Sequence, residues 1–166
     1  MGNMPLSLEF ANAHIEAFRE PLVAPPPHGF HGGPVLGATD PERRFRHTRN
    51  RVPVDAFGGH GQGFDHLAGE YAYGGPVYDH FGHTMAEFVH RIIPTRSARA
   101  HPKWLFVATA NGPTTLSNLP AWATDIYRFL DVDLSSLVLT QNTSVDALLI
   151  AESGSDLGAG PYDQYL

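Results

Sequence analysis

The chain has 166 residues and a mass of 18.1 kDa, which is the size of one ordinary domain or of part of a larger protein. Hydrophobic residues make up 42% of it, so we expect it to fold, and its net charge of -6 argues against nucleic acid as a partner because a phosphate backbone needs a basic surface. Since there is no cysteine, disulfide frameworks, thiolate zinc sites and cysteine nucleophiles are excluded.

The amino-terminal residues lack the features of a secretory signal. No lysine or arginine precedes Arg19, Glu9 and Glu16 are acidic, and no unbroken apolar run is present. The longest apolar runs, 104–108 and 147–151, are far shorter than the roughly 20 residues that cross a bilayer. We therefore expect no integral membrane segment, and a cytoplasmic protein that is free or bound peripherally at the inner membrane.

The first region, residues 1–69, is rich in proline, glycine and arginine, and we expect it to be irregular. A rough helical period of apolar side chains over 6–19 predicts one short helix there. Five prolines and three glycines in 21–34 predict a loop or linker. The five arginines of 43–51 form either an anion-binding patch or a solvated loop balanced by nearby acidic residues. Residues 58–63 lack the Lys-Ser/Thr of a phosphate-binding loop and predict a flexible turn.

The second region, residues 70–166, is more regular and predicts an α/β domain. Its expected elements are an aromatic strand or hairpin over 70–78 broken at Gly74-Gly75-Pro76, a strand at 104–108, a helix from Pro120 to about Asp131, and strands at 137–140 and 147–151. This order predicts a layered fold with a buried sheet. Residues 153–166 carry no terminating element in this interpretation.

A further helix is predicted over residues 81–94, with Pro94 as its end. At about 100° per residue, four apolar side chains share one side of that helix and should be buried. The opposite side is polar and rich in histidine. The expected core side is Phe81, Met85, Phe88 and Ile92, and the polar side is His80, His83, Glu87, His90 and Arg91.

Three interpretations of the polar side remain open on residue types alone. It can be an ordinary solvated surface. It can be a metal site of His83, Glu87 and His90, although these three ligands in line on a straight helix span about 10 Å and the H-E-x-x-H order is absent. It can also be an acid–base site, in which Glu87, one turn after His83, orients the imidazole and raises its basicity.

The segment Gly82-His83-Thr84-Met85-Ala86-Glu87-Phe88-Val89-His90-Arg91 resembles the Gly-His-(aromatic)-x-x-Glu-x-x-x-Arg helix of the family 61 glycosyltransferases. These include the bacterial capsular polysaccharide biosynthesis proteins, whose branch the preceding Asp79-His80-Phe81 fits. Thr84 stands where the family has an aromatic residue. The resemblance covers about residues 70–166, with further similarity at Trp104, 120–122, 129–132 and 148–158.

The resemblance implies a Rossmann-like amino-terminal half of a GT-B glycosyltransferase that inverts configuration and needs no metal or other cofactor. A nucleotide-sugar would bind mainly to a carboxy-terminal domain absent from these 166 residues, so we expect an inactive fragment that presents the side of the cleft for a glycan acceptor. The matching catalytic residues are His83, as base, and Glu87, as its partner. Arg91, Gly82 and His80 would contribute to substrate binding.

Two other classes of function stay open. One is a metal-dependent hydrolase that uses His83, Glu87 and His90, and the other is a non-catalytic carbohydrate-binding fragment that exposes its tyrosines and tryptophans. A rival glycosyltransferase signal is Asp131-Val132-Asp133, which matches the metal-binding Asp-x-Asp of the GT-A class. Because it follows a helix rather than a buried strand, we interpret it as a solvated turn.

Overall fold

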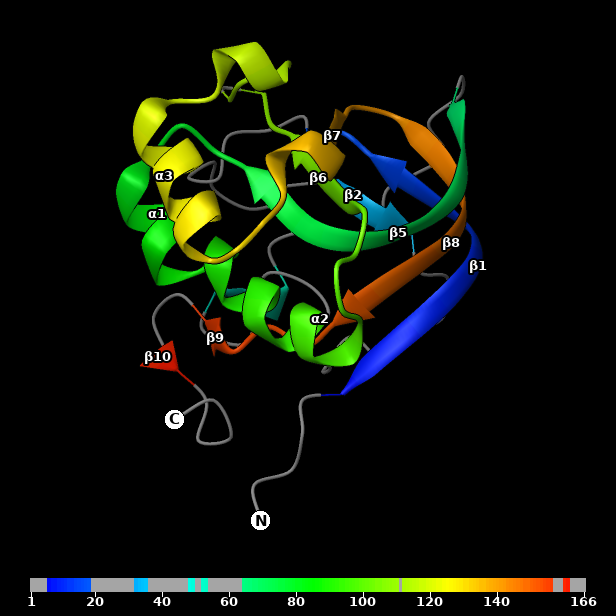
Figure 1. Ribbon diagram of the computed structural model, residues 1–166, viewed down its shortest axis with the longest axis horizontal. Coiled ribbons are helices and arrows are strands. Elements are labelled where there is room, and N and C mark those ends of the chain that lie inside the picture. Colours follow the sequence, from blue (N-terminus) through cyan, green and yellow to red (C-terminus); the bar gives the residue numbers. More distant parts are fainter. Residues whose placement is uncertain are drawn as a thin grey trace.

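A computed structural model describes residues 6–18, 32–35, 48–49, 52–53, 64–110, 112–156 and 160–161. Its centre is a curled six-stranded mixed sheet with helices packed against it, which confirms the expected α/β class (Figure 1). The strand order is β2-β1-β8-β5-β6-β7. The strands are β1 (Ser7–Glu16), β2 (Gly33–Val35), β5 (Asp65–Val77), β6 (Trp104–Ala108), β7 (Leu137–Thr140) and β8 (Thr143–Ala151).

The sheet has a parallel part and an antiparallel part. Strands β8, β5, β6 and β7 run parallel to one another. Strand β1 runs antiparallel to both β8 and β2. The carboxyl ends of β5 and β6 lie next to each other, since Val77 pairs with Ala108. That edge is where open α/β sheets usually bind their ligands.

The helices are short. They are α1 (Phe81–Ala86), α2 (Ile92–Ala98) and α3 (Ala121–Phe129), with 3-10 turns η1 (Phe88–Arg91), η2 (Leu116–Asn118) and η3 (Leu134–Ser136). Two-residue strands form the pairs β3 (Thr48–Arg49) with β4 (Val52–Pro53) and β9 (Ser155–Asp156) with β10 (Gly160–Pro161). The latter pair lies where the sequence predicted no element.

Two hydrophobic cores lie on the two faces of the sheet. The core under the helices includes Val89, Ile92, Ala123 and Tyr127 together with side chains of β5, β6, β7 and β8. The other core is formed by side chains of β1, β5, β6 and β8 with Phe88. Both faces are therefore buried along the middle of the sheet, which explains why 104–108 and 147–151 are continuous apolar runs.

Strand β5 is bent at two points where its register shifts. The first shift lies between Leu67 and Glu70 and includes Gly69 at φ 112°, and the second lies between Tyr73 and Gly75. A positive φ suits glycine because it has no Cβ. The predicted break at Gly74-Gly75-Pro76 is therefore wrong, because the chain forms a bulge there and the strand continues to Val77.

The first region departs most from the expectation. The helix predicted over 6–19 is wrong: Ser7–Glu16 forms strand β1, paired with β8 over most of its length. Gly33–Val35 belongs to the sheet as well, so the described parts of residues 1–69 are not irregular. Pro34 is tolerated because β2 is an edge strand. The glycine turn at 58–63 and most of the arginine cluster lie outside the described residues.

Candidate functional site

The residues that carry the family resemblance follow β5 and extend through α1 and η1. His80 has an extended backbone and is the N-cap of this helix. Its Nδ1 accepts a hydrogen bond from the backbone N–H of His83 at 3.3 Å. A Cβ added to Gly82 would lie 3.2 Å from the His80 ring, so the close approach that this glycine allows is that of the His80 imidazole.

The helix predicted over 81–94 is interrupted at Glu87. That residue has φ -141° and ψ -61°, and the chain continues as the 3-10 turn η1 and then as α2. Pro94 does not end a helix, as the sequence predicted, but is the third residue of α2. Proline is tolerated in a first turn because its missing N–H has no helical partner there.

This interruption changes which side chains are buried, so the predicted stripe is wrong in half of its members. Phe88 and Ile92 are buried, whereas Phe81 is 56% exposed and Met85 is 42% exposed. On the side expected to be polar, Glu87 is only 2% exposed and Arg91 is fully buried. The phase of a straight helix does not apply across a break.

His83 is half-buried within a group of aromatic rings. The Tyr78 ring meets it edge to face at 5.8 Å, and the His80 ring lies 4.7 Å from it. Thr84, which stands at the family's aromatic position, is buried and donates from Oγ1 to the Tyr78 carbonyl at 3.4 Å. The imidazole of His83 is thus positioned by neighbouring rings, in a residue that is partly exposed as a whole.

Glu87 and Arg91 lie deeper. One hydrogen bond between Glu87 and His83 joins backbone groups, with the Glu87 N–H donating to the His83 carbonyl at 3.1 Å. Arg91 donates from Nη1 to the Ala151 carbonyl, and its guanidinium carbon lies 5.4 Å from the centre of the Tyr73 ring. These contacts give Arg91 a structural role. The substrate-binding role stays a prediction, as does the orienting role of Glu87.

The third histidine of this segment does not join a metal site in the described structure. His90 Nε2 and the Met85 carbonyl are hydrogen-bonded at 2.9 Å, so the imidazole spans the break at Glu87. Burial lowers the pKa of His90, and the bond to Met85 opposes that shift. Among the described residues, no group of three His, Asp or Glu side chains is placed to hold one metal ion.

The two aspartates of the Asp-x-Asp sequence have local partners. Asp131 pairs with Arg96 at 2.5 Å. Asp133 accepts hydrogen bonds from the side chain and the backbone N–H of Ser135, which lower its pKa and cap η3. Both side chains are exposed, as expected for a solvated turn.

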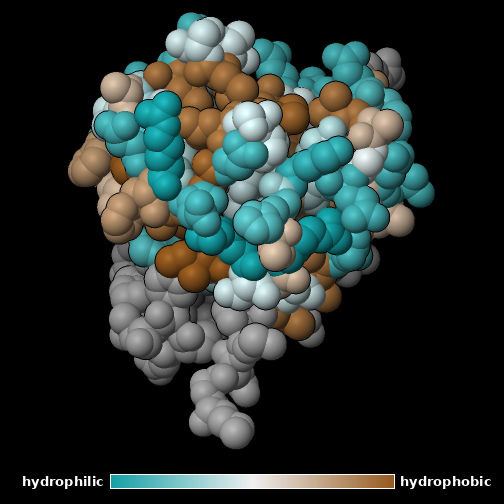
Figure 2. Space-filling view, in the orientation of Figure 1, coloured by the Kyte–Doolittle hydropathy of each residue, from teal (hydrophilic) through white to brown (hydrophobic). Residues whose placement is uncertain are grey.

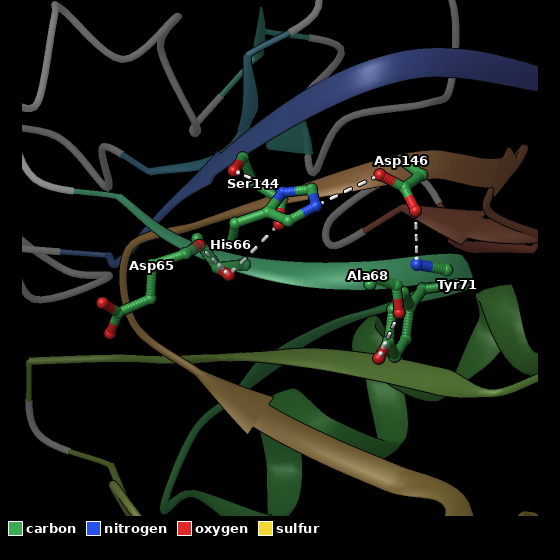
Figure 3. Close-up of polar contacts among 8 residues, drawn as sticks. Asp65, His66, Ala68, Tyr71, Ser144 and Asp146 are labelled. Carbon is green, nitrogen blue, oxygen red and sulfur yellow. Dashed lines mark hydrogen bonds and ion pairs between the residues drawn. The ribbon is translucent and has the colours of Figure 1, made fainter.

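One polar cluster was missed by the sequence analysis. His66 of β5 contacts Ser144 through Nδ1 at 3.2 Å and Asp146 through Nε2 at 3.1 Å, and Asp146 also accepts from the Gly69 N–H at 2.7 Å (Figure 3). The pairing of β5 with β8 creates this line of Ser, His and Asp, so no local sequence pattern reveals it. The His66 and Asp146 side chains are about half exposed, at 56% and 54%. Since the cluster satisfies the N–H of the β5 bulge, we interpret it as a structural clip.

The carbohydrate-binding alternative expected the tyrosines and tryptophans at the surface, but four of the six that lie in the described residues are buried. These are Tyr71, Tyr73, Trp104 and Tyr127. Burial also raises the pKa of the Tyr127 phenol. Tyr78 and Trp122 are partly exposed.

Comparison with known proteins adds no assignment. No protein-family model matches the chain, and neither the curated proteins nor the solved structures contain a match to it. Within the described residues, no helix has the length and apolar composition that crossing a membrane requires.

Proposed function

We propose that the chain is the amino-terminal, acceptor-side part of an inverting glycosyltransferase similar to family 61. In this proposal the fold is the Rossmann-like half of a GT-B enzyme. A nucleotide-sugar binds mainly to a carboxy-terminal domain outside residues 1–166. The product would be a bacterial surface polysaccharide, such as a capsular one.

The observation that carries the proposal is the position of His83. It lies on α1, which follows β5 after three residues, at the edge where the parallel strands β5 and β6 end. The rings of Tyr78 and His80 contact its ring and hold the imidazole in place, and the residue as a whole is partly exposed. A general base needs both properties, a fixed orientation and access to the substrate hydroxyl.

In the proposed mechanism, His83 takes the proton of the acceptor hydroxyl as that oxygen attacks the anomeric carbon of the donor. The bond from that carbon to the nucleotide diphosphate breaks in the same in-line displacement. The base raises the rate because the attacking oxygen gains negative character as its proton leaves. Glu87, on the next turn of the chain, would favour the protonated imidazole that results.

The test is turnover of nucleotide-sugars by the chain joined to the sequence that follows it in its gene. His83→Ala should lower turnover by about two to four orders of magnitude, the usual worth of a general base. His101→Asn is the matched control, because His101 is an exposed histidine after α2 and outside this segment, and asparagine tolerates its φ of 50°. Near-normal turnover of His83→Ala, with circular dichroism unchanged, would contradict the assignment.

Glu87→Gln separates orientation from base chemistry. We expect it to lower turnover less than His83→Ala, because the imidazole is retained. Since Glu87 is buried, the melting temperature of the Glu87→Gln variant must be measured alongside its turnover. A loss of turnover explained by unfolding would show a lowered melting temperature, whereas a chemical defect would not.

A further inference from the structure

A surface groove of about 390 Å³ lies between the segment after β5 and helix α3. Met85 and Val89 line one side of it, and Ile126 of α3 and Leu130, the residue that follows α3, line the other. Hydrophobic residues also reach the surface on the side of the molecule where α1 and α3 lie (Figure 2). The volume of the groove falls within the range of about 300–1,000 Å³ typical of small-molecule sites, which are mostly apolar with a few polar groups.

The break at Glu87 shapes this groove. Met85 ends up partly exposed beside it, and the His90 imidazole spans the break to bond with the Met85 carbonyl. Burial lowers the pKa of His90, which favours the neutral imidazole in the groove. The neutral ring and the four aliphatic side chains provide a surface that favours an apolar body.

The charged side chain that lines the groove is the carboxylate of Asp125. Phe129, one turn further along α3, also lines it and is 87% exposed. Arg128 approaches Asp125 at 3.6 Å, but both side chains are more than 60% exposed, at 66% and 76%, and such pairs contribute little. A cation in the groove can therefore compete for this carboxylate.

A carboxylate beside an exposed aromatic ring is a suitable pair of groups for an organic cation. The carboxylate supplies charge complementarity, and the face of an aromatic ring attracts ammonium groups electrostatically. We propose that the groove binds an organic ammonium ion with an apolar body, the ammonium group lying between Asp125 and Phe129 and the apolar body lying along Met85 and Ile126. This proposal is independent of the role of His83.

The experiment compares three probes of equal length: hexylammonium, hexanol and hexanoate. Each is titrated into the ¹⁵N-labelled chain, and amide shifts of α3 are followed by NMR. We expect saturable shifts with hexylammonium, and binding at least about tenfold weaker for hexanol because it lacks the charge-assisted contact. Equal binding of hexanol and hexylammonium, or no saturable shift with the amine, would overturn the proposal.

Variants locate the site. Asp125→Asn should weaken hexylammonium about tenfold or more, and Phe129→Ala should weaken it several-fold. Glu9→Gln is the matched control because Glu9 is an exposed carboxylate on β1, away from the residues that line the groove, and it should bind the amine as the wild type does. Unchanged binding by Asp125→Asn would overturn the proposal. So would a dimer, seen by sedimentation, that Phe129→Ala dissociates, because the groove would then be an interface between two copies.

Discussion

The guanidinium of Arg91 donates from Nη1 to the backbone carbonyl of Ala151 and so joins the turn η1 to the last residue of β8. A second bond lies close by, from the Gly154 N–H to the His90 carbonyl at 2.9 Å. The segment that carries the family resemblance is thus fixed to the end of a central strand. Because its side chain is fully buried and holds these two elements together, Arg91 stabilises the fold at this point.

Replacing Arg91 should therefore destabilise the protein. Arg91→Met keeps much of the volume but leaves the buried Ala151 carbonyl without its donor, which should cost about 1–3 kcal/mol in the free energy of unfolding. The measurement is urea denaturation. Arg128→Met, at an arginine whose side chain is 66% exposed, is the matched control and should change stability by less than about 1 kcal/mol. Equal effects of the two variants would contradict the structural role of Arg91.

The broken helix predicts opposite results for two phenylalanines that the sequence placed on one buried stripe. Phe88→Ala should lower the free energy of unfolding by about 3–5 kcal/mol, because Phe88 is 2% exposed and its loss leaves a cavity. Phe81→Ala should cost under about 1 kcal/mol because Phe81 is 56% exposed, although its ring meets Trp122 edge to face at 5.6 Å. Similar losses for both variants would instead support one continuous helix.

The sequence predicted the elements whose pattern is local. The strands at 104–108, 137–140 and 147–151 are confirmed, the last as part of β8. All three are short and largely apolar runs, and the first two also contain several β-branched or aromatic residues. The helix after Pro120 is confirmed as well, although it ends at Phe129 and leaves that ring at the surface. In each case the residues themselves favour the observed conformation.

The elements that were missed depend on residues far along the chain. Strand β1 forms because Ser7–Glu16 pairs with β8, more than 120 residues away, and a helical period in ten residues cannot reveal that partner. Glu87 is another example, since the helix break there buries two charged groups that a straight helix would expose. The sequence predicted which residues form the candidate site, but which of them are buried depends on the fold.

Asp146 makes two contacts at the β5 bulge, one with His66 and one with the Gly69 N–H, and two variants separate them. Asp146→Asn removes the ionic contact to His66 but keeps an oxygen that can accept from the Gly69 N–H, whereas Asp146→Ala removes both. We expect Asp146→Ala to lower the free energy of unfolding by about 1 kcal/mol, the net worth of one hydrogen bond, and Asp146→Asn to cost less. Chemical denaturation measures both. If the two variants lose the same stability, the bond to Gly69 is not what holds the bulge.

Burial of His90 should make stability depend on pH. Its pKa in the folded protein lies below the ordinary value of 6.5, so above that value the imidazole is neutral in both the folded and the unfolded chain. Below it, the unfolded chain takes up a proton that the folded chain resists, and the free energy of unfolding therefore decreases as the pH falls from about 6.5 toward the folded pKa.

His90→Gln removes this titration. The free energy of unfolding, measured by urea denaturation at a series of pH values from about 8 to about 5, should therefore decrease less steeply in the variant than in the wild type. His101→Asn is a suitable control because His101 is exposed and has φ 50°, a conformation that asparagine tolerates. The comparison depends on the shape of the curve, since His90→Gln also loses stability at every pH by replacing the imidazole that bonds to the Met85 carbonyl. A pH curve for His90→Gln that runs parallel to the wild-type curve would show that the proton on His90 has no part in stability.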